Sequence, residues 1–267
     1  MTAPHDSLVA FQWRRLKTGL CWVIFGLGGL GLSMTYFPYL RLTVNDPIKR
    51  RLMARAMIAR SFNFFADAIR WLDVAAIDRA SLAKMRTLRG SIIIANHPTI
   101  LDYVLIASML PEMDCLVKAS LRHNFFLKHV IRAADYMSND GSADTLDEIA
   151  RRLKAGENIL IFPEGTRTTP GVPIKLKRGV AHASLRTGCP LAIVHIKCSH
   201  AWLTKQMEWY EIPPVKPSIT LSFEGMIEPQ AYVRAGEEGF SLASRRLTEA
   251  MRRELLKASG REHEIEG

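Results

Sequence analysis

The chain has 267 residues and a formal net charge of +10. This length is enough for one α/β domain with its own core plus an appendage. The cysteines form no close pair and no zinc-binding spacing, which excludes a disulfide-stapled or zinc-finger protein and predicts reduced thiols on the cytosolic side (Cys21, Cys115, Cys189, Cys198). His195 and His200 flank Cys198, but no second cluster completes a ligand set, so we expect no metal site.

The positive charge is concentrated at the start of the chain. Residues 1–60 hold nine basic side chains against two acidic ones (Arg14, Arg15, Lys17, Arg41, Lys49, Arg50, Arg51, Arg55, Arg60; Asp6, Asp46). This basic region surrounds the most apolar part of the chain, which favours anionic lipid as its partner. A nucleic-acid protein would instead interleave basic and aromatic residues on its folded domain, so we expect no nucleic-acid partner.

Residues 18–40 carry no charge and predict a membrane segment. A continuous helix of this length reaches about 34 Å, which is enough for the hydrocarbon core of roughly 30 Å. Aromatic residues near its two ends suit the membrane interfaces (Trp13, Trp22, Tyr36, Tyr39). A cleaved signal peptide is the alternative, but the apolar run is long and no small-x-small cleavage signal follows it.

The topology of this segment has two interpretations. Glycines between positions 26 and 31 permit a re-entrant bend, whereas an unbroken helix would span. Both flanks are basic, and the stronger cluster follows the segment. In either case the rest of the chain is expected at the cytoplasmic face of the inner membrane.

A second helix follows, with apolar residues spaced 4-3-4-3 (Ile58, Phe62, Phe65, Ile69, Leu72). This stripe fits a helix packed on the domain core, and it equally fits a helix lying on the bilayer. We therefore divide the chain into an N-terminal anchor with a basic juxtamembrane helix, residues 1–60, and a folded domain, residues 61–267.

From residue 91 the predicted strands and helices alternate. Strands are expected at 91–96, 115–117, 158–162, 191–196 and 218–223, and helices at 99–110, 123–133, 142–155, 177–187 and 241–258. This order is typical of an α/β fold with a central, mostly parallel or mixed sheet flanked by helices. Such sheets place their chemistry at the carboxyl ends of the strands.

The first candidate catalytic pair follows the first of these strands. His97 and Asp102 lie five positions apart. On one regular helix they would point about 140° apart and could not meet. Pro98 disfavours helical backbone at His97 and fits a first helical position, so Asp102 in the second turn would face back toward the imidazole. A neutral histidine held by a carboxylate can act as a general base. The alternative is that both residues only cap the helix.

A second candidate motif, Phe162-Pro163-Glu164-Gly165-Thr166-Arg167, stands where the strand at 158–162 ends. Gly165 permits positive φ, and Arg167 offers a guanidinium fork for phosphate or carboxylate. Glu164 can accept a hydrogen bond from a substrate or orient Arg167. Lys177, with Lys175 and Arg178, starts the next helix and offers further positive charge, although solvated lysines at a helix start fit equally well.

The two motifs together resemble those of the glycerolipid acyltransferase family, over about residues 85–225. The resemblance implies direct acyl transfer from acyl-coenzyme A or acyl carrier protein to a lysolipid hydroxyl in phospholipid biosynthesis. It implies His97 as base, Asp102 as its orienting partner, and a role in substrate binding for the turn and the basic stretch after it (Glu164, Gly165, Thr166, Arg167, Lys177). It implies no metal and no prosthetic cofactor.

The chain departs from this family between the two motifs. Phosphate-using members carry a glycine and an arginine there, whereas residues 133–140 lack that glycine and have Asn139 near the arginine's place. Loss of one charged hydrogen bond weakens phosphate binding roughly ten- to a hundredfold. The acceptor is therefore either 1-acylglycerol-3-phosphate-like or a non-phosphate lipid such as lyso-ornithine lipid. A non-catalytic module that binds lipid or acyl carrier protein is the alternative of another class.

Overall fold

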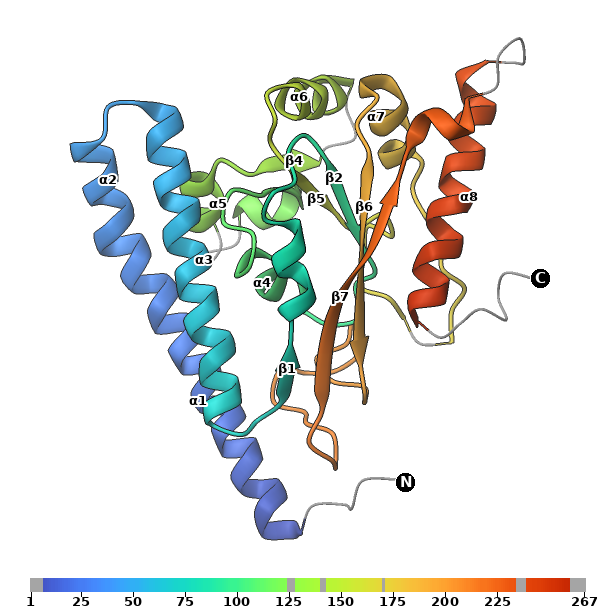
Figure 1. The fold of residues 1–267 in the computed structure, drawn as a ribbon. Helices are drawn as coiled ribbons and strands as arrows, with labels where there is room; N and C mark the ends of the chain where they lie inside the picture. Colours follow the sequence, from blue (N-terminus) through green and yellow to red (C-terminus); the bar gives the residue numbers. More distant parts are fainter. Residues whose placement is uncertain (1–6, 124–127, 140–142, 170, 234–238, 260–267) are drawn as a thin grey trace.

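The computed structural model describes residues 7–123, 128–139, 143–169, 171–233 and 239–259. Its centre is a seven-stranded mixed sheet with the order β1-β7-β6-β2-β5-β3-β4 (Figure 1). The strands are β1 Ala76–Asp78, β2 Ile92–Ala95, β3 Asp114–Lys118, β4 Met137–Asn139, β5 Ile159–Ile161, β6 Leu191–Cys198 and β7 Ser218–Ile227. All neighbouring pairs are parallel except β6 and β7. The predicted α/β class is confirmed.

Helices cover both faces of this sheet, as Figure 1 shows. One layer holds α1 Leu8–Gly31, α2 Phe37–Thr43, α3 Pro47–Trp71, α4 Asp102–Ala107 and α5 Lys128–Ala134. The other holds α6 Ala143–Lys154, α7 Gly179–Thr187 and α8 Phe240–Ser259. Strand β2 is buried on both sides: Ile93 and Ala95 join the first core, whereas Ile92 and Ile94 join the second. Such strands read as continuous apolar runs.

Two strands and several boundaries were not expected from the sequence. β1 and β4 are three residues each and too short to show a period. β7 continues to Ile227, because a register shift between Ile193 and Val194 lets it follow β6 along its length. Asp140 and Ser142, which fell in predicted segments, lie outside the described residues.

The apolar N-terminal segment forms one continuous helical stretch, Leu8–Thr43, long and apolar enough to cross a membrane by length and composition. Its 36 residues extend about 54 Å. No re-entrant bend occurs at the glycines between 26 and 31; the irregularity is a π turn at Leu32–Tyr36. There the Ser33 and Thr35 hydroxyls donate to the carbonyls of Gly29 and Gly31.

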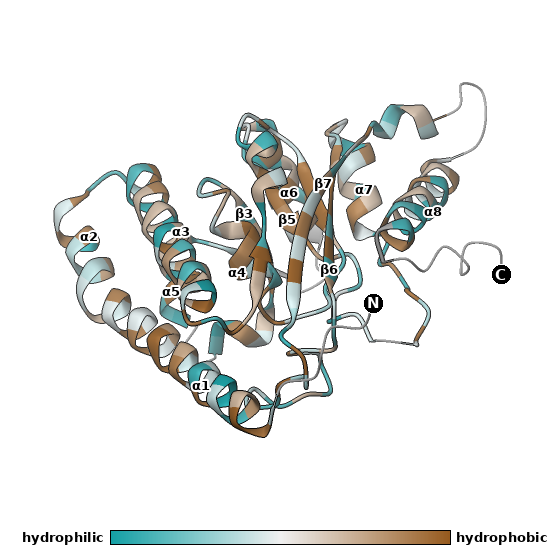
Figure 2. Ribbon diagram, turned by 60° about the horizontal axis from the view of Figure 1, so that its bottom comes forward, coloured by the Kyte–Doolittle hydropathy of each residue, from teal (hydrophilic) through white to brown (hydrophobic). Residues whose placement is uncertain are grey.

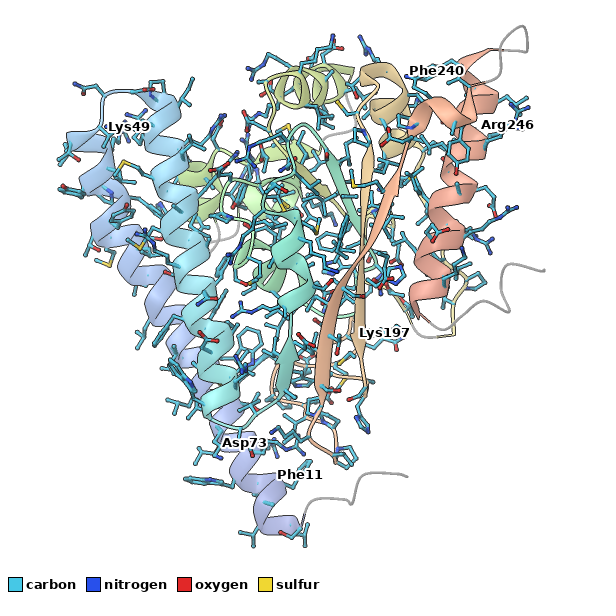
Figure 3. The ribbon with its side chains drawn as sticks, viewed as in Figure 1. Phe11, Lys49, Asp73, Lys197, Phe240 and Arg246 are labelled. Carbon is cyan, nitrogen blue, oxygen red and sulfur yellow. The ribbon has the colours of Figure 1, made fainter. Side chains whose placement is uncertain are left out.

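This stretch lies beside α3 as an antiparallel hairpin, with Phe11 near the start of α1 and Asp73 just after α3 at the same end (Figure 3). The Phe25 ring stacks on Phe62, with centroids 6.1 Å apart. The Trp22 Nε1 donates to the Trp209 carbonyl, and Arg14 donates to that of Pro213. The hairpin is therefore fastened to the domain.

The apolar stripe of α3 packs on the domain core. Ile58, Phe65 and Ile69 are at most 3% exposed, so this interpretation of the stripe is confirmed. The opposite face exposes Phe64 by 55% and Trp71 by 72%. Helix α3 also runs unbroken across residue 60, where the sequence suggested a boundary.

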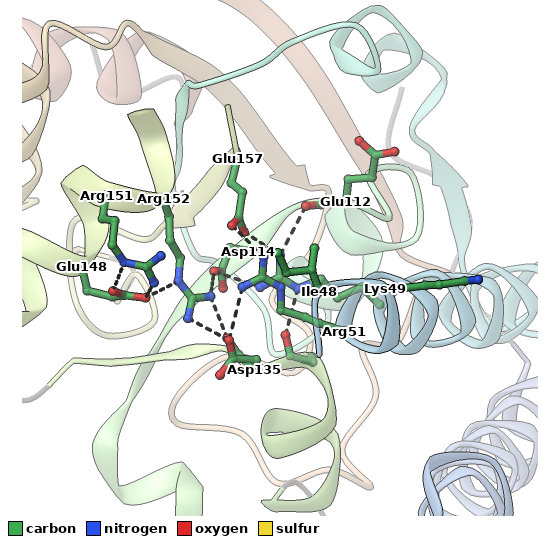
Figure 4. Close-up of polar contacts among 12 residues, drawn as sticks. Ile48, Lys49, Arg51, Glu112, Asp114, Asp135, Glu148, Arg151, Arg152 and Glu157 are labelled. Carbon is green, nitrogen blue, oxygen red and sulfur yellow. Dashed lines mark hydrogen bonds and ion pairs between the residues drawn. The ribbon is translucent and has the colours of Figure 1, made fainter. Parts of the chain in front are cut away.

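Two arginines of the basic run turn inward, which corrects their assignment to lipid headgroups (Figure 4). Arg55 is 1% exposed, and its Nη2 lies 2.9 Å from Oδ2 of the fully buried Asp114. Arg51 pairs with Glu157 at 2.8 Å. Arg152 of α6 also pairs with Asp114, so the network joins α3 to the sheet and to α6. A buried charge is stable only when it is paired, and Asp114 and Glu157 supply the partners for these two arginines.

Candidate active site

The site lies at the carboxyl ends of adjacent parallel strands. β2 pairs with β5 in the register Ile94↔Ile161, so the segments that leave these two strands start side by side. One carries His97 and Asp102, and the other carries Glu164 and Arg167. The shared edge brings together two motifs about 65 positions apart in the chain.

Asn96 fixes the point where the chain leaves β2. Its Nδ2 donates to the Ile196 carbonyl and its Oδ1 accepts from the Ile196 N–H, both at 2.8 Å. The amide thereby continues the β2–β6 pairing after the strand has ended. It is 2% exposed, so both amide groups would be unsatisfied without this pairing. The backbone of His97 is therefore held from the β6 side.

The β5 side holds His97 equally firmly. The His97 N–H donates to Thr168 Oγ1 at 3.0 Å, and the Thr168 N–H donates to the His97 carbonyl at 2.7 Å. The imidazole stacks on the Phe162 ring, with centroids 4.1 Å apart and planes 18° apart. Packing against Phe162 thus helps to orient the imidazole ring, in addition to its contact with a carboxylate.

The His97 Nδ1 lies 2.7 Å from Asp102 Oδ2, the contact that the spacing predicted. Asp102 is fully buried and also accepts from the Thr99 N–H at 2.8 Å and the Thr99 hydroxyl at 2.6 Å. Burial raises the pKa of Asp102, while the hydrogen bonds from His97 and Thr99 act to lower it. Donation from Nδ1 to this carboxylate leaves the lone pair of a neutral imidazole on Nε2.

The route by which the two side chains meet differs from the prediction. Helix α4 begins at Asp102, and residues 99–101 form a bend and turn, so Pro98 is not at a first helical position. The reason is local: Asp102 binds the Thr99 backbone and hydroxyl, which closes a turn that competes with a helix. Asp102 is therefore a first-turn residue, and the irregular chain before it brings His97 back to its carboxylate.

The glutamate turn is built around Gly165, which has φ +70°. A Cβ at this position would meet Lys177 Cε at 2.7 Å and Nζ at 2.8 Å. The structure thus brings Lys177 onto the turn, and the Lys177 N–H also donates to the Pro163 carbonyl. Glu164 Oε1 accepts from the Thr168 hydroxyl at 2.6 Å, while Thr166 is exposed. Through Thr168, the glutamate is connected to the backbone of His97.

Comparison with known proteins gives a consistent result. A family model described as Acyltransferase matches residues 81–197. A 1-acyl-sn-glycerol-3-phosphate acyltransferase of Cocos nucifera is 28% identical over 120 residues, which cover 42% of this chain and 39% of that relative. The chain thus matches about two-fifths of the curated relative's length.

The fold of the chain also has a solved counterpart. The crystal structure of the 1-acyl-sn-glycerophosphate (LPA) acyltransferase, PlsC, from Thermotoga maritima matches with a TM-score of 0.63 and 18% identity. The match covers 91% of this chain and 97% of that one. The match therefore extends over most of the chain, and it shows that the fold is shared.

Arg167 makes contacts within the chain that the sequence did not predict, while its predicted role in substrate binding stays a prediction. Its Nη1 donates to the carbonyls of Leu203 and Thr204, at 3.1 and 2.8 Å. Part of the guanidinium fork therefore ties the glutamate turn to the segment after β6. Glu164 Oε1 accepts a hydrogen bond from the Thr168 hydroxyl. This contact orients Thr168 and does not involve Arg167.

Sequence reasoning missed Asn96, Thr99 and Thr168 as parts of the site. Asn96 and Thr99 stand inside the His97 motif, and their polar side chains beside a buried strand end were an available signal. Thr168 follows Glu164 by four positions, but its bond to His97 spans 71 positions and has no local signal. Among the described residues, no group of three or more histidine, cysteine, aspartate or glutamate side chains gathers as a metal site.

Proposed function

We propose that this protein is a membrane-associated O-acyltransferase that moves a fatty acyl group from a thioester donor to the hydroxyl of a lysolipid. The observation that carries the proposal is the 2.7 Å contact between His97 Nδ1 and the buried Asp102, at the open end of a strand in an acyltransferase-family domain. The contact supports a base role better than a capping role, because the imidazole nitrogen of His97 pairs with a carboxylate and not with the backbone groups at the end of a helix.

The step we propose is a direct transfer. His97 Nε2 removes the proton of the lipid hydroxyl as its oxygen attacks the thioester carbonyl. A C–O ester bond forms, the C–S bond breaks, and the proton passes from the imidazolium to the departing thiolate. Asp102 stabilises the imidazolium while the proton is on the ring. The scheme needs a donor thioester of coenzyme A or acyl carrier protein, the acceptor lipid, and no further cofactor.

We propose a 1-acylglycerol-3-phosphate-like acceptor. Asn139 stands at the end of β4, where the resemblance leads one to expect arginine, but it pairs in register with Lys118 at the end of β3. Lys118 is exposed and lies at the same edge of the sheet as His97. An exposed ammonium there can supply the positive charge that a phosphate headgroup needs. A zwitterionic acceptor such as lyso-ornithine lipid is the second candidate, favoured by the asparagine.

The hairpin of α1 and α3 supports attachment to a membrane. Its outer side exposes large apolar residues along its length (Leu16 63%, Leu20 47%, Val23 54%, Leu27 64%, Met34 70%, Phe64 55%, Trp71 72%). Figure 2 shows hydrophobic stretches along α1 outside the domain core. An apolar surface of this extent is typical of a membrane-binding face. We place the protein at the inner membrane, with the domain facing the cytoplasm.

The test is an acyl-transfer assay with the full chain in detergent. Wild-type protein is given an acyl-coenzyme A and a panel of acceptors that includes 1-acylglycerol-3-phosphate and lyso-ornithine lipid. We expect transfer to the phosphate lipid, and a loss of at least a hundredfold in His97→Ala. Equal turnover in His97→Ala would eliminate the base role. Donor or lipid binding without transfer to any acceptor would favour the non-catalytic module.

A further inference from the structure

The two motifs of the site share one backbone carbonyl, that of Leu203. It accepts from the Ile100 N–H at 3.2 Å, and Ile100 lies between His97 and Asp102 in the chain. It also accepts from Arg167 Nη1 at 3.1 Å, at the end of the glutamate turn. Leu203 belongs to neither motif, because it follows β6. The side chain of one motif and the backbone of the other thus meet on one oxygen atom.

The backbone of Leu203 adopts a conformation that is rare for a leucine. Its φ is +54°, and the residue is 3% exposed. A residue with a Cβ is unfavourable at positive φ, and such conformations persist where the surrounding structure holds them. Both neighbours in the chain are also buried, Trp202 at 2% exposure and Thr204 at 8%. The Leu203 carbonyl is therefore held in place by buried neighbours and by its two donors.

Arg167 is the charged one of these donors. Besides Leu203, its Nη1 also reaches the carbonyl of Thr204 at 2.8 Å, and the side chain is partly buried. Hydrogen bonds from a charged donor are stronger than those between neutral groups. The guanidinium is therefore a firm link between the glutamate turn and the segment after β6.

The residue after Arg167 makes a second link to the same loop. Thr168 exchanges hydrogen bonds with the backbone of His97, at 3.0 and 2.7 Å. The loop from His97 to Asp102 is thus held at two points, at His97 by Thr168 and at Ile100 by the carbonyl that Arg167 binds. Without the guanidinium, the second point would lose its charged support. A shift of about 1 Å in a reacting group is enough to slow catalysis by roughly a hundredfold.

We propose that Arg167 is a positioning residue for the base. By binding the Leu203 carbonyl it fixes the loop that carries His97, and so sets where Nε2 meets the lipid hydroxyl. This inference rests on the proposed function and deepens it, because it assigns Arg167 to the proton-transfer step. In the role that the sequence predicts, the guanidinium would instead contact the phosphate or carboxylate of the substrate. The two roles predict different changes in kcat and KM.

The kinetic test is Arg167→Met, which keeps an unbranched side chain and removes every donor. With palmitoyl-coenzyme A and 1-acylglycerol-3-phosphate, we expect kcat to fall by about 10- to 100-fold, while the KM of the acceptor stays within about twofold of wild type. Arg186→Met is the matched control, because Arg186 is exposed on α7 and pairs there with Asp147; it should leave kcat unchanged. A raised acceptor KM with an unchanged kcat would overturn the proposal.

Hydrogen–deuterium exchange tests the same contact without turnover. Exchange is followed by mass spectrometry in the substrate-free protein, on the peptide that contains the loop 97–102. We expect this peptide to exchange at least about threefold faster in Arg167→Met, with peptides from α8 unchanged, because the hold on the Ile100 N–H is weakened locally. Unchanged exchange in the loop would overturn the proposal, since a residue that only binds substrate does not affect the free protein.

Arg167→Lys is the second variant, for the case that Arg167→Met lowers the Tm of the whole protein. Its ammonium can still donate to a carbonyl. We expect its kcat and its loop exchange to lie between those of wild type and Arg167→Met. Wild-type kcat and exchange with a raised acceptor KM would count against the proposal. If the wild type transfers to no acceptor, yet the loop exchanges faster in the variants, the proposed function is refuted and the role of Arg167 in holding the loop is retained.

Discussion

The replacement Asp102→Asn tests the central contact with the smallest change in shape. The fully buried carboxylate accepts from His97 Nδ1 and twice from Thr99. Asparagine has one oxygen to accept with and an amide that donates. If the oxygen keeps Thr99, the amide faces His97 Nδ1, and the neutral imidazole then carries its proton on Nε2. That nitrogen can no longer accept a proton from the lipid.

The expected loss in kcat is about 10³- to 10⁴-fold, which corresponds to roughly 4–5.5 kcal/mol of barrier. Stability should change by only about 1 kcal/mol. Burial raises the pKa of Asp102, so the neutral amide avoids part of the desolvation penalty and offsets its weaker hydrogen bonds. The variant should therefore be folded and inactive.

Steady-state acyl transfer and thermal unfolding are measured on the same preparation. Asp144→Asn is the matched control, because Asp144 is exposed in the first turn of α6 and remote from the site. Retention of more than a tenth of the wild-type kcat in Asp102→Asn would refute the tautomer argument. A large fall in Tm would show instead that the carboxylate acts mainly on the fold.

Three further substitutions test other parts of the structure. Gly165→Ala should destabilise the protein by about 1–2 kcal/mol in chemical unfolding and reduce activity. The alanine would have to keep φ +70°, which is unfavourable for a residue with a Cβ, and its Cβ would displace Lys177. Arg55→Met should lower the free energy of unfolding by about 3 kcal/mol, since Asp114 loses one of its two buried arginines. Burial lowers the pKa of His195 below 6.5, so its protonation favours the unfolded chain. As pH falls below 6.5, wild-type stability should drop relative to His195→Gln by up to about 1.4 kcal/mol per pH unit, measured by urea unfolding across pH.

Each of these tests has its own control and contrary result. Gly19→Ala places a methyl in open space on α1 and should not destabilise; an equal effect at both glycines would remove the argument from φ. Lys49→Met neutralises an exposed residue of the same helix, which Figure 4 shows pointing away from the ion-pair network. Similar losses in Lys49→Met and Arg55→Met would mean that the buried network is not the cause. Parallel stability–pH curves for wild type and His195→Gln would contradict the assignment to His195.

The sequence alone was sufficient for the features that depend on local order. The alternating apolar runs gave the α/β class, the uncharged run at 18–40 gave the N-terminal helix, and the spacing of His97 and Asp102 gave a pair that does meet. These signals are short in range. Burial of a strand on both faces, the length of a helix, and a turn between two neighbouring side chains all leave their mark within a few residues.

Tertiary structure decided what each charged group touches. Arg55 reads from the sequence as one of several basic residues next to a membrane segment, yet its partner Asp114 is 59 positions away and buried. Arg167 binds carbonyls 36 and 37 positions further on, and Thr168 holds His97 across 71. Such pairings are set by which strands become neighbours in the sheet. A charged residue carries the same local pattern whether it ends in water, against a lipid or on a buried carboxylate, and only the packed chain separates these outcomes.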